Sequence, residues 1–262
     1  SSIIYRLACR KNRMGSFGGY LLFALVPVIL ILRSAWFKGQ IGEFKVNFGM
    51  KLLLNRDVFR LFKNVTLPFE DGTTQIDHLV ISPFGIFVVE TKNMNGWIFG
   101  SSNQERWTQQ LFRKKFQFQN PLRQNYAHVK AVQDMLGLDQ RHVFNVIVFL
   151  GGCKLKTAMP DEVRNGVFDL VTFIKSKRDP LLAEQDLPCL IETLMKHRLD
   201  PGFRTRRLHL RNIKRRAADR KLKAKSCPRC GSTMIERTNA KSGELFLGCR
   251  HYPQCTGTRS LS

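Results

Sequence analysis

The sequence lacks the glycine-rich and nucleophile motifs of several large enzyme classes. It contains no phosphate-binding P-loop, no dinucleotide-binding glycine motif and no serine nucleophile elbow, so neither an ATP-driven role nor a redox role with a nucleotide cofactor has support. It also contains no internal repeat and no low-complexity tract. With 262 residues, 43% of them hydrophobic, the chain can form one medium domain and a smaller one. This composition excludes a disordered, a collagen-like and a multi-span membrane chain.

Acidic residues are scarce. The chain has 43 Lys and Arg against 20 Asp and Glu, a formal net charge of +23, which points to nucleic acid or an anionic membrane surface as partner. The excess peaks in residues 196–225, where 13 Lys and Arg face only two Asp. We interpret residues 199–225 as a basic, partly helical linker that contacts phosphates, with a solvated charged helix as the alternative. The candidate phosphate contacts are Arg206, Arg207, Lys214, Arg215 and Arg216.

Long apolar runs are also rare, and only one could cross a membrane. Residues 15–32 carry no charge, and 18 residues of helix span about 27 Å, close to the thickness of a hydrocarbon core. After a basic segment at 1–14, we therefore predict a transmembrane helix at 15–37; a cleaved signal peptide or a buried helix is the alternative. We expect a single-pass protein of the bacterial inner membrane that contacts the lipid bilayer through this span, with residues 33–262 in the cytoplasm.

The main domain is expected at residues 39–198. Strand-like runs precede alternating helical and strand-like segments, which favours an α/β layered fold with a mixed sheet. The predicted strands are 58–66, 74–82, 85–92, 96–100, 142–150 and 166–174, and the predicted helices are 40–55, 121–137 and 180–198.

Four of the seven cysteines have metal-ligand spacing. Cys227 and Cys230 form one pair, and Cys249 and Cys255 form a second pair 18 residues later. Four thiolates close a tetrahedral shell around zinc without an open position, so we predict a structural zinc site in a module at 226–258. The other cysteines are scattered, which fits a reducing compartment.

The residues around these cysteines are more specific than their spacing. The segments CPRCG at 227–231 and GCRHYPQC at 248–255, with Gly243 before an aromatic, resemble the four-cysteine zinc finger of bacterial type I topoisomerases. The resemblance implies a module that binds single-stranded DNA, and no other part of the chain resembles a topoisomerase. Aromatic side chains would then stack on bases and cations would contact phosphates, although the aromatics could instead pack around the zinc knuckles. The candidates are Phe246 and Tyr252 for stacking, and Arg229, Arg237, Lys241 and Arg250 for phosphates.

A second group of chemically active residues lies on a predicted hairpin at 74–92. A turn centred between Pro83 and Phe84 places Asp77 opposite Glu90 and Gln75 opposite Lys92, all on one sheet face. Two carboxylates can hold Mg²⁺ or Mn²⁺ while leaving positions for water and phosphate, and a nearby ammonium can orient the water. The pattern is that of metal-dependent phosphodiester hydrolysis; a cross-strand salt bridge is the alternative.

Residues 39–137 resemble the nuclease-related domain, NERD, a branch of the PD-(D/E)xK nuclease superfamily. The resembling segments are Gly42-Glu43, QIDH at 75–78, GIFVVETK at 85–92, Gly96-Trp97 and NPLRQ at 120–124. The resemblance implies a restriction-endonuclease-like mixed sheet core, with Asp77 and Glu90 as metal ligands and Lys92 as the catalytic lysine. Glu43 would add a carboxylate, and Gln124 would be an assisting polar residue or an ordinary exposed glutamine. His78 is expected to pack on the opposite face. His128, one helical turn after Gln124, is a weaker candidate for the same cleft.

These observations favour a membrane-anchored, Mg²⁺- or Mn²⁺-dependent nuclease with a DNA-binding zinc module. A non-catalytic membrane-associated DNA-binding protein with the same fold is the runner-up. An RNA-processing nuclease is a third interpretation, because phosphodiester chemistry is shared, although DNA is favoured over RNA as partner.

Overall fold

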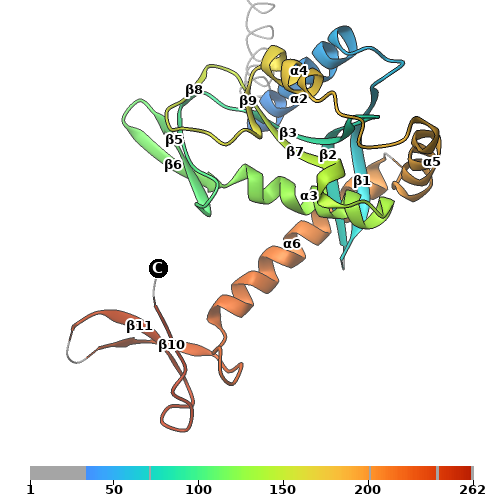
Figure 1. The fold of residues 1–262 in the computed structure, drawn as a ribbon. Helices are drawn as coiled ribbons and strands as arrows, with labels where there is room; N and C mark the ends of the chain where they lie inside the picture. The colour runs from blue at the N-terminus through green and yellow to red at the C-terminus, as the bar shows by residue number, and fades with distance from the viewer. Residues whose placement is uncertain (1–33, 71, 201, 240–241, 261–262) are drawn as a thin grey trace, which may run out of the picture. The chain divides into compact units, whose positions relative to one another are not determined.

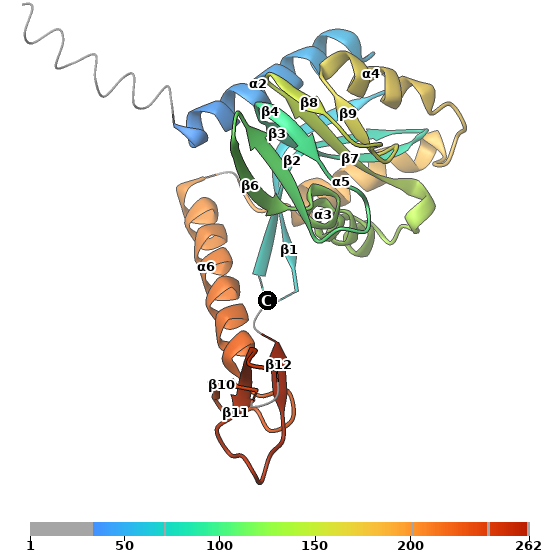
Figure 2. The same ribbon diagram turned by 90° about the vertical axis from the view of Figure 1, so that its left-hand side faces the viewer.

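The computed structural model describes residues 34–70, 72–200, 202–239 and 242–260 (Figures 1 and 2). These residues form two compact units. Among the described residues, the first consists of 34–69 together with 74–199, and the second of the described residues of 70–73 and 200–260.

A five-stranded mixed sheet is the centre of the first unit. Its strands lie in the order β1 (Arg60–Phe69), β2 (Gly72–Ser82), β3 (Gly85–Asn93), β7 (Val143–Leu150) and β9 (Val163–Asn165). The β2–β3 pair is antiparallel, whereas β3–β7 and β7–β9 are parallel. The predicted mixed α/β architecture is confirmed.

Helices cover both faces of this sheet (Figure 1). Helices α2 (Ala35–Leu53) and α4 (Val167–Ser176) cover one face, and α3 (Pro121–Leu136) and α5 (Leu187–His197) cover the other. Successive β3 residues alternate between the two cores: Ile86 and Val88 pack with α3, and Phe87 and Val89 pack with α2 and α4. Burial on both faces explains why β3 reads as a nearly continuous apolar run. Short 3₁₀ helices lie at Gln140–His142 and Glu184–Asp186.

A second sheet begins shortly after the end of β3, with β4. It has four strands in the order β6 (Lys114–Gln119), β5 (Arg106–Leu111), β4 (Gly96–Phe99) and β8 (Cys153–Leu155). Its core contains the fully buried Ile98 and Trp107, and the Trp107 ring stacks on Phe149 with a centroid distance of 6.1 Å. The polar residues of β5 and β6 gave no alternating apolar pattern, so sequence analysis did not predict these two strands.

Helix α3 confirms the prediction at 121–137, and its ends have well-defined caps. The Asn120 side chain accepts a hydrogen bond from Leu122 N, Pro121 occupies the first turn, and Gly137 ends the helix with φ of 64°. The fully buried Asn125 donates to Val88 O at 2.8 Å and to Asn145 Oδ1 at 2.7 Å. These bonds tie α3 to β3 and β7, and they orient the helix face that carries Gln124 and His128.

The predicted strand at 166–174 is wrong, because these residues form α4. Leu170, Val171 and Ile174 are buried with helical spacing rather than in alternation. Asp169 in the first turn accepts a hydrogen bond from Asn165 N at 2.7 Å, which supports the helix start. The high content of β-branched and aromatic residues suggested a strand, but the tertiary contacts of one helical face decided the structure.

The predicted helix at 40–55 is α2, which starts earlier, at Ala35. The predicted transmembrane segment at 15–37 lies outside the described residues except for its last positions, which belong to Ser34 and the start of α2. No helix in the described part of the chain is long and apolar enough to cross a membrane.

The second unit contains a long helix and a small sheet. Helix α6 (Phe203–Lys225) occupies most of the basic segment, and the antiparallel strands β10 (Met234–Thr238), β11 (Leu245–Cys249) and β12 (Thr258–Ser260) follow.

Candidate functional site

The β2–β3 hairpin has the predicted register. Ser82 pairs with Gly85 and His78 with Val89, as a turn centred between Pro83 and Phe84 requires. Asp77 follows along β2, and its Oδ2 accepts a hydrogen bond from Thr91 N at 2.9 Å. The Asp77 carboxylate therefore reaches the end of β3 that carries Glu90 and Lys92.

Glu90 is the most connected residue of this site. It is only 5% exposed, and its Oε1 lies 2.7 Å from both Lys92 Nζ and Gln124 Nε2. Lys92 Nζ also donates to Gln124 Oε1 at 2.9 Å, so these three side chains form a closed ring. Glu90 Oε2 lies 3.6 Å from His128 Nε2. The structure thus brings Gln124, and also the weaker candidate His128, to the carboxylate on β3.

Thr74 is a participant that sequence analysis missed. Its Oγ1 lies 2.5 Å from His128 Nδ1, which orients the imidazole toward Glu90. Its position on the same strand as Asp77 was the available indication. Gln75 was predicted to join the cluster, but within the described residues no side-chain hydrogen bond connects it to Lys92.

Glu43 approaches the site from α2. The close contact of Gly42 with Asn93 allows this, because a Cβ at Gly42 would lie 2.9 Å from Asn93 Cβ. His78 lies on the opposite side of β2 and forms a hydrogen bond with the backbone of Glu43. Burial lowers the pKa of His78 to about 4, so the ring is neutral at pH 7. His78 is therefore a packing residue that holds α2, as predicted from its strand position.

The three carboxylates influence one another electrostatically. Burial, followed by the nearby charge of Glu90, raises the pKa of Asp77 well above its usual value and also raises the pKa of Glu43. Burial alone would raise the pKa of Glu90 too, but His128 and the Lys92 ammonium outweigh burial and lower it. The ionised form is therefore favoured at Glu90, and ionisation of its two acidic neighbours, Asp77 and Glu43, is disfavoured.

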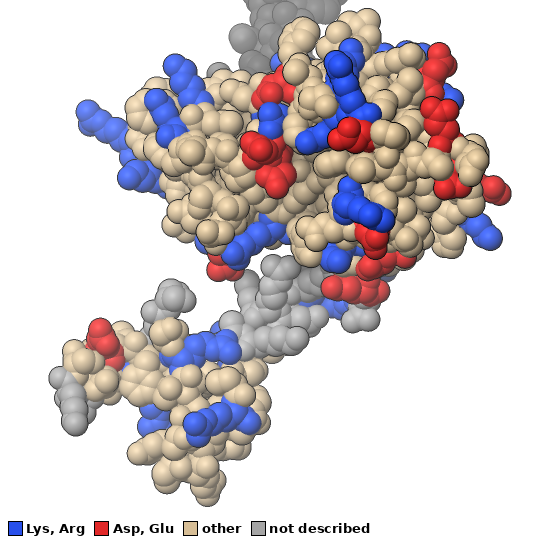
Figure 3. All heavy atoms as spheres, viewed as in Figure 1, with Lys and Arg blue, Asp and Glu red and all other residues tan. Residues whose placement is uncertain are grey.

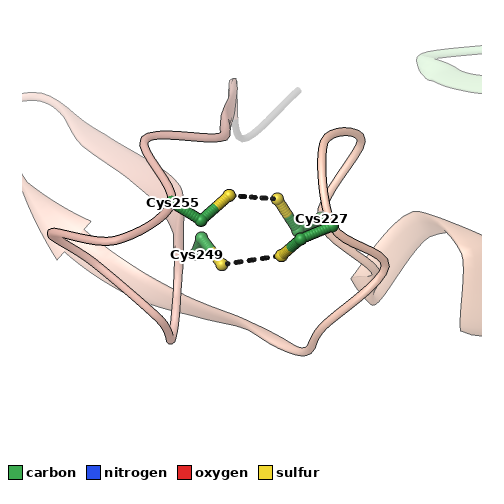
Figure 4. A group of neighbouring side chains, drawn as sticks. Cys227, Cys249 and Cys255 are labelled. Atoms are coloured by element: carbon green, nitrogen blue, oxygen red, sulfur yellow. Dashed lines mark hydrogen bonds between the residues drawn. The ribbon is translucent and has the colours of Figure 1, made fainter.

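The four predicted zinc ligands come together at the other end of the chain (Figure 4). Their Sγ atoms all lie within 4.8 Å of one another, with 3.6 Å between Cys227 and Cys255 and 3.4 Å between Cys230 and Cys249. A tetrahedral zinc site with Zn–S bonds of about 2.3 Å needs sulfur separations of about 3.8 Å. A Cβ at Gly257 would collide with Cys227 Sγ, so the chain leaves this space to sulfur. The donor set and spacing fit zinc.

The predicted nucleic-acid contacts of the zinc module lie partly on one surface. Arg237, Phe246 and Tyr252 line a cavity of about 580 Å³, and the Arg237 guanidinium lies 5.2 Å from the Tyr252 ring centroid. Tyr252 is 60% exposed, whereas Phe246 is half-buried. Arg250 is exposed, and Arg229 Nη1 donates to Thr256 Oγ1 at 2.7 Å.

The remaining predicted cations have varied positions. Lys241 lies outside the described residues. Arg207, Lys214 and Arg215 are exposed on α6, which also carries Arg206 and Arg216.

Comparison with known proteins finds two family matches in the chain. The nuclease-related domain family matches residues 38–150, and the topoisomerase DNA-binding C4 zinc finger family matches residues 224–262. An uncharacterized protein of Bacillus anthracis is 36% identical over 187 residues, which cover 67% of this chain and 88% of the relative. No solved structure matches the chain significantly. The two matches indicate a DNA-binding, nuclease-like protein, and the chain belongs to the same family as this Bacillus anthracis relative, with a nuclease-related domain and a C4 zinc finger.

Proposed function

We propose that the chain is a divalent-metal-dependent nuclease that hydrolyses DNA phosphodiester bonds with a restriction-endonuclease-like core. The observation that carries the proposal is the ring of Glu90, Lys92 and Gln124, with Asp77 and Glu43 at the same end of β3. An ion pair between Lys92 and Glu90 does not require further acidic side chains around it. A site for a divalent metal ion does require them.

The donor set fits Mg²⁺ or Mn²⁺. Carboxylate oxygens are the ligands these ions prefer. Burial and, after it, repulsion by Glu90 raise the pKa of Asp77, and a divalent cation would offset both costs. Asp77 and Glu90 would hold the ion, and Glu43 would add a third carboxylate. When bound, the ion would supply positive charge to the phosphate and acidify a water molecule.

The protein side chains supply the remaining roles. The Lys92 ammonium orients the attacking water and offsets negative charge on the phosphate in the transition state. Gln124 holds both Lys92 and Glu90, and so fixes the distance between ammonium and carboxylate. His128, positioned by Thr74, keeps Glu90 ionised.

The runner-up is a non-catalytic DNA-binding protein in which Lys92 and Glu90 form a structural ion pair. The short Lys92–Glu90 contact of 2.7 Å favours it. Among the described residues, the four cysteines form a closed group of ligand atoms and the carboxylates do not. The two functions are distinguished by whether the protein cleaves nucleic acid at a rate that depends on a divalent metal ion.

In Glu90→Gln and Asp77→Asn variants, we expect cleavage with Mg²⁺ to fall at least about 100-fold, because each variant removes one of the two carboxylates that would hold the ion, and Glu43 does not replace it. Lys92→Met should slow cleavage with little loss of metal affinity. Single- and double-stranded DNA and RNA are incubated with Mg²⁺, with Mn²⁺ or with chelator, and melting temperatures are recorded in parallel. Glu192→Gln, an exposed carboxylate on α5, is the matched control. Normal cleavage by folded Glu90→Gln protein would refute the site, and no cleavage by the parent protein would favour the runner-up.

The raised pKa of Asp77 predicts a dependence of stability on pH. A carboxyl whose pKa is raised by folding stabilises the metal-free protein when protonated, and this stabilisation is lost as pH rises through the raised pKa. At pH 8 without metal, Asp77→Asn should therefore melt higher than the parent, and the difference should shrink toward pH 4. Mg²⁺ should raise the melting temperature of the parent but not of Asp77→Asn. Asp134→Asn, exposed on α3, should follow the parent in every condition; a lower melting temperature for Asp77→Asn at pH 8 contradicts the interpretation.

The zinc site predicts one zinc ion per full-length chain. Cys227→Ser and Cys249→Ser should each lose the metal, because three thiolates and a hydroxyl bind zinc far more weakly. They should also bind single-stranded oligonucleotides more weakly, since the aromatic surface depends on the zinc fold. Zinc is measured by elemental analysis and binding by fluorescence anisotropy. Cys189→Ser, an exposed cysteine outside the cluster, is the control. Full zinc content in Cys249→Ser would exclude this ligand set.

We also propose that the chain is anchored in the inner membrane, with its domains in the cytoplasm. The uncharged run at 15–32 supports the anchor. Helix α2 has three exposed apolar residues on one face: Phe44, Phe48 and Leu52 are 67%, 60% and 70% exposed. Exposed Lys45 and Lys51 lie beside them.

The anchor predicts that the protein stays in the membrane pellet after alkaline carbonate extraction. Replacing both Leu25 and Val28 with Arg should release it, because two charges at mid-span are costly in hydrocarbon. A C-terminal reporter that is active only in the cytoplasm should be active. Release of the unmodified protein by carbonate, or reporter activity only in the periplasm, would contradict the anchor or its topology respectively.

A further inference from the structure

The second sheet of the nuclease-related domain lies next to the candidate active site. Strand β3 ends at Asn93, one residue after Lys92, and β4 starts at Gly96. The parallel pair β4–β8 continues the parallel pair β3–β7, with Asn93 opposite Leu150 and Gly96 opposite Cys153. At about 3.3 Å per residue, Trp97 lies within about 17 Å of Lys92 along the chain. A polymer bound at Lys92 therefore reaches this sheet within a few monomer units.

One face of this sheet is polar and basic. Partners across the strands share a face, and one such row contains Lys154, Trp97, Gln110 and Lys115. Trp97 is 45% exposed, Lys154 and Lys115 are exposed, and Lys156 Nζ lies 4.6 Å from the Trp97 ring centroid. The opposite face carries the buried Ile98, so the basic row faces solvent.

The next row on the same face borders a recess. Phe99, Thr108 and Gln117 are paired across β4, β5 and β6, and they line a cavity of about 700 Å³ together with Arg106 and Glu105. The outer face of the sheet thus borders a recess, and lysines and arginines outnumber its one acidic neighbour, Glu105.

The tip of the β5–β6 hairpin is unusual. Phe112 has φ of 53°, a left-handed conformation that bulky L-residues disfavour and that two-residue hairpin turns normally assign to Asn or Gly. Its side chain is 97% exposed, so no packing within the described structure compensates for this conformation. Arg113, Lys114 and Lys115 follow directly, and no acidic residue occurs between positions 106 and 119. In Figure 3, Lys and Arg side chains gather at the free end of this hairpin.

We propose that the β5–β6 hairpin and the outer face of the second sheet form a binding surface for duplex DNA. Arg113, Lys114 and Lys115 contact phosphates, and Phe112 enters a groove as an apolar wedge between base steps. The proposal rests on the proposed nuclease function, because it places the substrate duplex beside Lys92. It assigns this role to residues outside α6 and the zinc module.

Photocrosslinking of the full-length chain tests the contact without requiring cleavage. The chain carries p-benzoylphenylalanine at position 112 and is mixed with a 30-base-pair duplex in Ca²⁺. Position 168, an aromatic on α4 that is 77% exposed, is the matched control. We expect a DNA adduct from position 112 and at least about tenfold less from position 168. Equal yields would overturn the proposal, as would adducts formed with phosphatidylglycerol vesicles in preference to the duplex.

The salt dependence of duplex binding tests the cations. Arg113→Gln, Lys114→Gln and Lys115→Gln together should lower the slope of log affinity against log salt by about 2.7, at about 0.9 per phosphate contact. The control triple Lys175→Gln, Arg178→Gln and Lys196→Gln removes the same charge from α4, α5 and the loop between them, and should leave the slope unchanged. Phe112→Gly removes the ring and the left-handed strain, so it should raise the melting temperature while weakening binding about tenfold.

The outcomes separate the two proposals. Crosslinking at position 112 without metal-dependent cleavage would preserve this surface and reject the nuclease. Cleavage with an unchanged salt slope in the hairpin triple would preserve the nuclease and reject the surface. A lower melting temperature or unchanged affinity in Phe112→Gly would show that Phe112 serves the fold rather than DNA.

Discussion

The candidate active site depends on one constraint: the buried carboxylate of Glu90, near the end of β3, needs partners that compensate its charge. Glu90 lies on β3, and α3 supplies two of its partners, Gln124 and His128. An ionised carboxylate at 5% exposure is tolerable only because a cation and hydrogen-bond donors surround it. The sheet, the helix and the site therefore constrain one another, since a shift of α3 would leave Glu90 without its compensating partners.

Asn125 shows how the fold meets this constraint. Asn125 follows Gln124 directly in the sequence. Its side chain joins α3 to β3 and to Asn145 on β7. Because both strands next to the site are fixed to the same helical turn, the Gln124 amide has little freedom to leave Glu90. The candidate site is thus built on rigid elements, while the cations proposed to bind DNA lie on a hairpin tip, a helix and a small zinc-dependent module. Such a division is suited to a polymer substrate. Phosphate contacts must extend along the polymer, whereas cleavage requires fixed distances between the catalytic groups and the scissile phosphate.

The charge of the chain is distributed in accordance with this division. The acidic groups Glu43, Asp77 and Glu90 converge in a partly buried site. The basic residues are spread over exposed surfaces, including α6 and the β5–β6 hairpin. A net charge of +23 attracts polyanions of every kind. A group of carboxylates would repel a polyanion, so the acidic residues favour the proposed function, in which a metal ion lies between them and the phosphate.

Local patterns in the sequence were sufficient for features that depend on near neighbours. The hairpin register followed from its turn, the ends of α3 from Pro121 and Gly137, and the four-cysteine cluster from its spacing. Long-range packing decided the rest. Residues 167–176 form a helix because three of them fit one buried face, and β5 and β6 exist because Trp107 packs against Phe149 on another strand. The contact of His128 with Glu90, and the exposure of Phe112, likewise follow from how distant segments meet, and sequence periodicity carries no information about such contacts.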